Sequence, residues 1–227
     1  MRWVITGTNR GIGLELTRQL LDRGDVVDAA ARHPDADAYS KALGAGAGAS
    51  LRIHACDVQK DESVRAFAEG LEPGAIDVLV NNAGVMGKLQ SLEELDLQDV
   101  LATIDTNALG AVRVTRALLP RLKRGCKLVH ITSGMGSIGD NTSGGAYGYR
   151  MSKAALNMAS RSMAADLRGR GITSVVVNPG WVKTDMGGGG APLPVETSAA
   201  NIIRLIDGLR PEQSGSFLDH SGREWVW

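Results

Sequence analysis

Short apolar runs alternate with longer amphipathic stretches along this chain. Apolar runs that are bounded by glycine, asparagine or aspartate are typical of buried strands. We expect strands at residues 3–5, 25–31, 51–56, 76–80, 127–132, 172–177 and 216–218.

The stretches between these strands have the apolar spacing of helices that pack one face on a sheet. We expect helices at residues 14–23, 63–71, 149–167 and 195–209, a short helix with a flexible loop at 44–49 within 33–50, and two long stretches, 91–107 and 108–121, that can be continuous. Strands that alternate with helices indicate βαβ units and a parallel sheet. The sequence therefore predicts an α/β fold, a doubly wound and mostly parallel sheet of about seven strands with helices on both faces, in a single domain over residues 1–227.

Composition narrows the class of protein. The 227 residues are 43% hydrophobic, which is enough for a sizeable core, and the formal net charge is zero. A neutral chain with 4% aromatic residues gives no case for nucleic acid or an anionic membrane as a partner. No apolar run reaches the length of a membrane span and no signal-peptide pattern is present, so we expect a cytoplasmic protein. Cys56 and Cys126 are expected to be buried, reduced thiols, and no residue spacing indicates a metal site.

Polar residues and glycines follow several of the predicted strands directly. Gly7, Arg32, Asp57 and Asn82 each come just after a strand end. Ligands of parallel sheets bind beyond the carboxyl ends of the strands. We therefore expect these four residues to converge on one crevice.

A glycine-rich turn joins the first predicted strand to the first predicted helix. Glycines in this context let backbone N–H groups approach a pyrophosphate, and the helix N-terminus adds partial positive charge. The spacing Gly-x-x-x-Gly-x-Gly differs from the usual dinucleotide fingerprint, so a purely structural turn stays open. The residues expected to bind a dinucleotide here are Gly7, Asn9, Arg10, Gly11, Ile12 and Gly13.

Arg32, at the end of the second strand, bears on the choice of dinucleotide. A carboxylate at this position would bind the ribose hydroxyls of NAD, whereas an arginine can pair with the 2′-phosphate of NADP. Arg10 adds a second cation, and Asp28 lies mid-strand and should point elsewhere. The sequence predicts NADP(H), with solvated surface arginines as the alternative.

Tyr149 and Lys153 are spaced i, i+4 at the start of the helix expected at 149–167. Residues with this spacing lie on one helix face, so the ammonium should sit beside the phenol. A nearby positive charge favours the phenolate and lowers the tyrosine pKa toward neutrality. The pair is a candidate acid/base centre, although this spacing also arises by chance on exposed helices.

Taken together, these motifs resemble the short-chain dehydrogenase/reductase family over nearly the whole chain, and its C-factor or carbonyl-reductase branch in particular. The motifs that carry the resemblance are Thr6-Gly7-x-x-x-Gly11-x-Gly13, Asp57-Val58, Asn81-Asn82-Ala83-Gly84, Asn107, Ser133, Tyr149-x-x-x-Lys153 and Pro179-Gly180. The resemblance implies a Rossmann-like fold and relatives that are often dimers or tetramers, so a homodimer or homotetramer is expected.

The resemblance also implies a role for each site residue. Tyr149 would protonate a carbonyl oxygen, while Lys153 would lower the tyrosine pKa and hold the nicotinamide ribose. Ser133 would hydrogen-bond the substrate oxygen, and Asn107 would support a water relay to the lysine. The remaining cofactor contacts would come from Asp57, Val58 and Asn82 near the adenine and its ribose, from Val182 and Thr184 at the carboxamide, and from Ala83, Gly84, Pro179 and Gly180.

The serine position departs from the family pattern. The family serine usually lies about thirteen residues before the tyrosine, which would be Gly136 here, whereas Ser133 lies at the predicted strand end. We expect a small insertion after Ser133, with Ser137, Thr132 and Ser143 as weaker candidates. Tyr147 could be mistaken for Tyr149, but only Tyr149 has a lysine four residues later.

The predicted function is NADPH-dependent reduction of a ketone, aldehyde or quinone. Met86, Trp181 and Met186 would form an apolar pocket under a mobile flap at 181–193, and the apolar tail 224–227 would pack on the core or on a partner subunit. Two alternatives remain: a nucleotide-binding signalling protein of the C-factor type, and an NAD-linked alcohol dehydrogenase.

Overall fold

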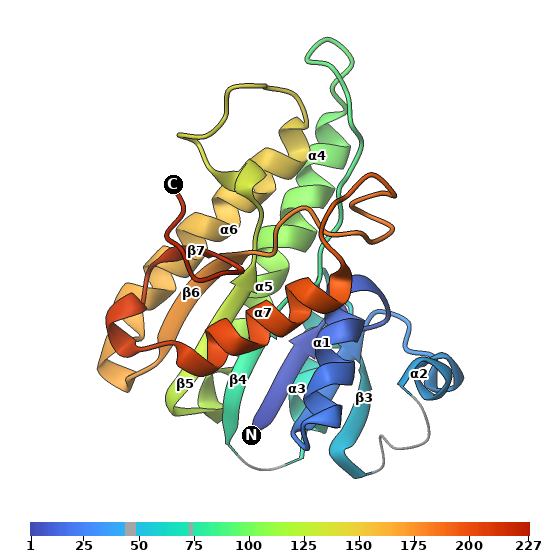
Figure 1. Ribbon diagram of the computed structural model, residues 1–227, viewed down its shortest axis with the longest axis vertical. Helices are drawn as coiled ribbons and strands as arrows, with labels where there is room; N and C mark the ends of the chain where they lie inside the picture. The colour runs from blue at the N-terminus through green and yellow to red at the C-terminus, as the bar shows by residue number, and fades with distance from the viewer. Residues whose placement is uncertain (44–48, 73–74) are drawn as a thin grey trace.

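A computed structural model describes residues 1–43, 49–72 and 75–227, and its centre is one seven-stranded sheet (Figure 1). Every neighbouring pair of strands is parallel, in the order β3-β2-β1-β4-β5-β6-β7. The strands are β1 Arg2–Thr6, β2 Val26–Ala31, β3 Leu51–Ala55, β4 Ile76–Asn81, β5 Leu122–Ile131, β6 Thr173–Asn178 and β7 Phe217–Asp219. The predicted fold class is confirmed; the flexible loop expected at 44–49 lies almost entirely outside the described residues.

Helices cover both faces of the sheet. The α-helices are α1 Gly11–Asp22, α2 Ala36–Leu43, α3 Asp61–Gly70, α4 Leu97–Ile104, α5 Gly110–Leu118, α6 Tyr147–Asp166 and α7 Val195–Gly208. Shorter helical segments are the π-helix η2 Asp105–Leu109 and the 3₁₀ turns η3 Leu119–Arg121, η4 Gly134–Gly136, η5 Arg168–Arg170 and η6 Pro211–Gln213. Figure 1 shows α1 and α7 side by side on the near face, with α5 and α6 behind the sheet. No described helix is long and apolar enough to cross a lipid bilayer.

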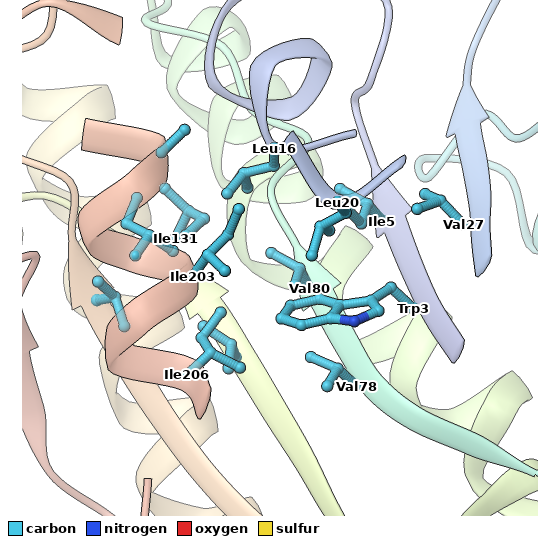
Figure 2. Close-up of a cluster of buried hydrophobic side chains, with 14 of the residues drawn as sticks. Trp3, Ile5, Leu16, Leu20, Val27, Val78, Val80, Ile131, Ile203 and Ile206 are labelled. Carbon is cyan, nitrogen blue, oxygen red and sulfur yellow. The ribbon is translucent and has the colours of Figure 1, made fainter. Parts of the chain in front are cut away.

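The alternation of side chains along β1 builds a core on each face. Trp3 and Ile5 pack with α1 and α7, and Figure 2 shows Trp3 in a cluster of aliphatic side chains that includes Ile206. Val4 packs on the opposite face of the sheet with α3 and α5. Each of the three is fully buried. Burying a side chain such as Ile5 contributes about 1.5–3 kcal/mol to folding. The apolar run therefore fixes β1 as a central strand covered on both faces.

The long helical stretch predicted at 91–121 differs from expectation at its start. The helix begins at Leu97, because the Asp96 carboxylate accepts hydrogen bonds from the N–H groups of Gln98 and Asp99 and caps it. From there α4, η2 and α5 follow one another without a break. The single turn of π-helix contains Asn107. Such π-turns are frequent at functional sites.

Strand β5 starts earlier than the sequence predicted, at Leu122 rather than residue 127. Lys123 and Arg124 interrupt the apolar pattern there because they are exposed at the end of the sheet. The pairing with β4 also shifts in register, from Ile76 opposite Leu122 to Val78 opposite Lys127. An irregular strand of this kind has no clean period of two for the sequence to reveal.

The strand order reverses around β1, since the chain moves outward from β1 to β2 and β3 and then returns to β4 on the other side. Open parallel sheets bind ligands at the carboxyl ends of the strands beside such a reversal. The segments that follow β1 and β4 begin with Gly7 and Asn82, which were both predicted to line the crevice.

Candidate active site

A cavity of about 1070 Å³ lies at the carboxyl ends of the strands. This volume exceeds what most small ligands need, so a dinucleotide and a substrate can share it. The predicted residues that line it are Gly7, Asn9, Arg10, Gly11, Ile12, Arg32, Asp57, Val58, Asn82, Ala83, Gly84, Ser133, Tyr149, Lys153, Pro179, Gly180, Val182 and Thr184. Two predicted residues, Gly13 and Asn107, do not line the cavity. Both are buried.

The glycine loop is shaped for a close approach of backbone to ligand. Gly7 and Gly11 have φ of +70° and +56°, which favour glycine. A Cβ on Gly13 would lie 2.2 Å from the carbonyl oxygen of Gly7, so the start of α1 packs directly on the loop. No side chain caps the N-terminus of α1. Its first N–H groups and partial positive charge are therefore suited to a phosphate.

Asn82 braces this loop from the neighbouring strand. Its side-chain Nδ2 donates hydrogen bonds to the carbonyl oxygens of Thr6 and Gly7, each at 3.0 Å. In return, the hydroxyl of Thr6 accepts from the backbone N–H groups of Asn82 and Ala83. The Asn82 side chain was predicted to border the adenine and its ribose; although Asn82 lines the cavity, its amide group holds the two strand ends together.

Arg10 and Arg32 are exposed cations on the cavity wall. Asp28 does not line the cavity; it is buried and paired with Arg2 and His54, as its mid-strand position suggested. The sequence did not predict a partner for Arg10. The Asp185 carboxylate lies 3.4 Å from the Arg10 guanidinium and links the segment at 181–193 to the glycine loop. An anion that binds Arg10 would therefore compete with Asp185.

Helix α6 presents Tyr149 and Lys153 to the cavity. Both are nearly buried, at 8% and 5% exposure. The Lys153 ammonium donates a hydrogen bond to the carbonyl oxygen of Ile131 at 2.9 Å and lies 5.7 Å from the centre of the Tyr149 ring. Burial alone lowers the pKa of Lys153 to about 8.

The Tyr149 phenol behaves differently from the sequence expectation. Burial raises its pKa above the usual value, and hydrogen bonding with Ser133 opposes the rise only in part. The net shift of the Tyr149 pKa is therefore upward, and the lowering by Lys153 that the sequence suggested stays a prediction. Desolvation of the phenolate is the largest cause of the shift, and the Lys153 ammonium donates its hydrogen bond to the carbonyl oxygen of Ile131.

Ser133 is the candidate hydroxyl that the fold brings to Tyr149. It lies just after β5 and caps the turn η4, where its Oγ accepts a hydrogen bond from the N–H of Met135. The other candidate hydroxyls make hydrogen bonds away from Tyr149. Thr132 lines the cavity but donates to Asn157. Ser137 is buried and accepts from Asp140, and Ser143 accepts from Arg150. Tyr147 does not line the cavity.

Asn107 does not line the cavity but holds two of the segments that do. Its side-chain amide exchanges two hydrogen bonds of 2.8 Å with the backbone of Val85 and donates a third to the hydroxyl of Ser152. That hydroxyl donates in turn to the carbonyl oxygen of Tyr149 at 2.7 Å. Asn107 thus ties the segment after β4 to the helix that carries Tyr149, while its expected part in a water relay stays a prediction.

Several residues that sequence reasoning missed also meet here. Ser152 lies inside the Tyr149 motif, directly before Lys153, and that place in the motif was the available signal. Met135 and Trp225 line the cavity beside Ser133 and Gly134, and Trp225 comes from the apolar tail. Among the described residues, no cluster of three or more His, Cys, Asp or Glu side chains could hold a metal ion.

Comparison with known proteins defines the class. The family model described as short chain dehydrogenase matches residues 2–190. The chain belongs to the short-chain dehydrogenase family, whose members are oxidoreductases, and the predicted family resemblance is confirmed.

Individual relatives are similar over most of the chain. The C-signal protein of Myxococcus xanthus is 53% identical over 166 residues, which make up 72% of this chain and 100% of that protein. The carbonyl reductase Sniffer of D. melanogaster has a TM-score of 0.93 at 32% identity, covering 100% of this chain and 99% of its own. An NADPH-bound carbonyl reductase from chicken fatty liver has a TM-score of 0.91 at 31% identity, covering 100% of this chain and 98% of its own.

Proposed function

We propose that residues 1–227 form one dinucleotide-binding domain that uses NADPH to reduce the carbonyl group of a ketone, aldehyde or quinone. The observation that carries this proposal is the meeting of Ser133, Tyr149 and Lys153 on the wall of the cavity that begins at the glycine loop. The likeness to an NADPH-bound carbonyl reductase supports the same cofactor and reaction.

The residues present fit NADP(H) chemically. The N–H groups at the start of α1 would hold the pyrophosphate, and a side chain on Gly13 would collide with the Gly7 carbonyl oxygen and so displace the loop that faces it. Arg10 and Arg32 supply positive charge for the 2′-phosphate, and Asp57 and Val58 lie on the same wall for the adenosine part. Further along the cavity, Val182 and Thr184 would hold the carboxamide and Lys153 the nicotinamide ribose. When bound, the reduced nicotinamide supplies the hydride.

The site residues then handle the substrate oxygen. The Ser133 hydroxyl would donate a hydrogen bond to the carbonyl oxygen and hold it beside Tyr149. A raised pKa keeps the Tyr149 phenol protonated at neutral pH, which suits a proton donor. After the proton has moved to the substrate oxygen, the positive charge of Lys153 stabilises the phenolate.

Exchange of Arg32 for aspartate tests the choice of cofactor. The Arg32→Asp variant should raise KM for NADPH about tenfold to a hundredfold, because a hydrogen bond to a charged group is worth about 1.5–3 kcal/mol, while KM for NADH stays equal or falls. Initial rates with both nucleotides measure the effect. Arg168→Asp makes the same charge change at an exposed residue that does not line the cavity and should leave both constants unchanged. A wild-type preference for NADH would support the NAD-linked alcohol dehydrogenase instead.

The depressed pKa of Lys153 predicts a pH profile. A lysine with a pKa of about 8 is charged below that pH and becomes neutral as the pH rises through it. Because kcat/KM reports groups of the free enzyme, kcat/KM for reduction should fall above about pH 8, well below the usual lysine value. Initial rates from pH 6 to 10 test this, and a profile that stays level through pH 9.5 would contradict it.

The direct experiment on the proposed function is a panel of ketones, aldehydes and quinones mixed with the purified protein and NADPH. Loss of NADPH absorbance with at least one class, together with appearance of the alcohol or quinol, supports it. If no class consumes NADPH although NADPH binds, the proposal fails.

A second candidate function is signalling with nucleotide binding and no essential turnover. The 53% identity to the C-signal protein of Myxococcus xanthus favours it. The complete Ser133, Tyr149 and Lys153 set favours turnover, because nucleotide binding alone does not require an acid. The Tyr149 variant described in the Discussion separates the two.

We further propose a homodimer or homotetramer in the cytoplasm. Leu97 and Leu101 on α4 and Met151 and Met158 on the adjacent α6 leave their apolar side chains exposed, and a second subunit would cover such a surface. Sedimentation equilibrium tests the assembly, and a monomer mass at high concentration would exclude it.

A further inference from the structure

β7 and the residues after it form a hairpin, here called the tail hairpin, residues 217–227, whose second arm runs back along β7. Leu218 and Glu224 form an antiparallel bridge, and the N–H of Trp225 donates to the carbonyl oxygen of Phe217 at 2.7 Å. The Asp219 carboxylate accepts hydrogen bonds from Ser221 and Arg223 and shapes the turn. Trp225 is therefore held in place by β7.

A second anchor fastens the tail hairpin to the loop after β5. The carbonyl oxygen of Trp227 accepts a hydrogen bond from the N–H of Gly139 at 2.8 Å. The Trp227 ring packs 5.4 Å from the Phe217 ring and 5.9 Å from the guanidinium of Arg161, outside the cavity. The two tryptophans of this segment thus have separate positions, one on the cavity wall and one away from it.

Trp225 stands next to the proposed hydroxyl donor. A Cβ on Gly134, which directly follows Ser133, would lie 3.3 Å from Cζ2 of the Trp225 indole. The indole Nε1 is buried and has no hydrogen-bond partner among the described residues. The ring is thus held by packing and contributes apolar area to the cavity wall beside Ser133.

Thioethers and a second indole line the same cavity as Trp225. Met135, Met186 and Trp181 also line the cavity, and Trp181 is 61% exposed on its rim. Indole faces pack against flat rings, and methionine sulfur makes favourable contacts with aromatic rings. In a chain with 4% aromatic residues, two indoles and two thioethers on the wall of one cavity favour a ring-bearing ligand.

We propose that Trp225 determines substrate specificity, as the wall of the substrate compartment that selects carbonyl compounds with an aromatic or conjugated ring next to the reacting group over small aliphatic ones. This inference rests on the proposed reductase function and names the substrate class for the same site. Trp225 touches the substrate's ring and takes no part in proton or hydride transfer.

Two diketones with the same reacting group test the inference. Diacetyl and its phenyl-substituted analogue are reduced at a common dicarbonyl unit and differ in the ring. Trp225→Ala should lower kcat/KM for the phenyl compound about tenfold to a hundredfold, mainly through KM, because ring packing and apolar burial are lost. For diacetyl the change should stay within about twofold, and Trp225→Phe should keep most of the wild-type preference.

Trp227→Ala is the matched control, since it removes an indole from the same hairpin but away from the cavity. It should leave the ratio of the two kcat/KM values unchanged, and thermal unfolding of each variant reports whether the hairpin holds. Equal losses on both substrates in Trp225→Ala, or the same shift of the ratio in Trp227→Ala, would overturn the inference and leave the reductase function standing. If the wild-type protein reduces neither diketone nor any other carbonyl compound, the proposed function fails and the inference with it.

Discussion

Replacing Tyr149 by phenylalanine is expected to lower kcat for carbonyl reduction about a thousandfold and to leave dinucleotide affinity unchanged. The substitution removes one hydroxyl and keeps the ring that packs beside Lys153. General acid catalysis contributes roughly a hundredfold to ten-thousandfold in rate, so loss of the proton donor should remove most of the turnover. Steady-state rates measure kcat, and titration of the protein with NADPH measures the affinity.

The control for this variant lies on the same helix. Tyr147→Phe removes the same atom two residues earlier, at a tyrosine that does not line the cavity, and should change kcat by less than about twofold. Activity of Tyr149→Phe within tenfold of the wild type would remove the phenol from the mechanism. In the signalling alternative, Tyr149→Phe binds nucleotide and keeps the full cellular phenotype.

Replacing Gly13 by alanine is expected to damage both stability and dinucleotide binding. The new Cβ would lie 2.2 Å from the Gly7 carbonyl oxygen and 2.5 Å from the Asn82 Nδ2, so backbone must move. Forcing extra atoms into packed structure costs about 1–3 kcal/mol, and the displaced loop would lose the hydrogen bond between Asn82 and Gly7. Urea unfolding measures the free energy, and NADPH titration should show a dissociation constant raised about tenfold or more.

Gly70→Ala supplies the comparison for this change. Gly70 ends α3, and apart from its chain neighbours and its own helix backbone no atom of the described residues lies within 4 Å of a Cβ built there. An alanine at an open helical position stabilises by about 0.5–1 kcal/mol. If Gly13→Ala unfolds like Gly70→Ala and binds NADPH as the wild type does, the close contact between α1 and the glycine loop does not exist in solution.

The parts of this protein that the sequence predicted are those set by local pattern. Trp3, Val4 and Ile5 place apolar side chains on both faces of a strand, so three residues were enough to predict a buried parallel strand. Gly7 and Gly13 could be interpreted because both lie in one short strand-turn-helix motif, although Asn82 and Ala83, which pack against them, are distant in sequence. Family resemblance added Ser133, whose place at a strand end agreed with the structure even though its spacing to Tyr149 did not match the family.

The features that the sequence could not predict depend on contacts between residues that are distant in the chain. The sign of the Tyr149 pKa shift follows from how fully the fold buries the phenol, which no spacing reveals. Asn107 reaches Val85 and Ser152 through a turn of π-helix, and one extra residue in a helical turn leaves little trace in a hydrophobic pattern. The pairing of Arg10 with Asp185 joins residues that are 175 positions apart.

The antiparallel return of the tail hairpin along β7 has a consequence for solubility. β7 is three residues long and forms the outer margin of the sheet, where unpaired backbone amides and carbonyls can recruit a strand from another molecule. By occupying that margin through the bridge between Leu218 and Glu224, the chain blocks edge-to-edge aggregation with a piece of itself. Detaching the hairpin would thus remove Trp225 from the cavity wall and also expose the edge of β7 to pairing with a strand of another molecule.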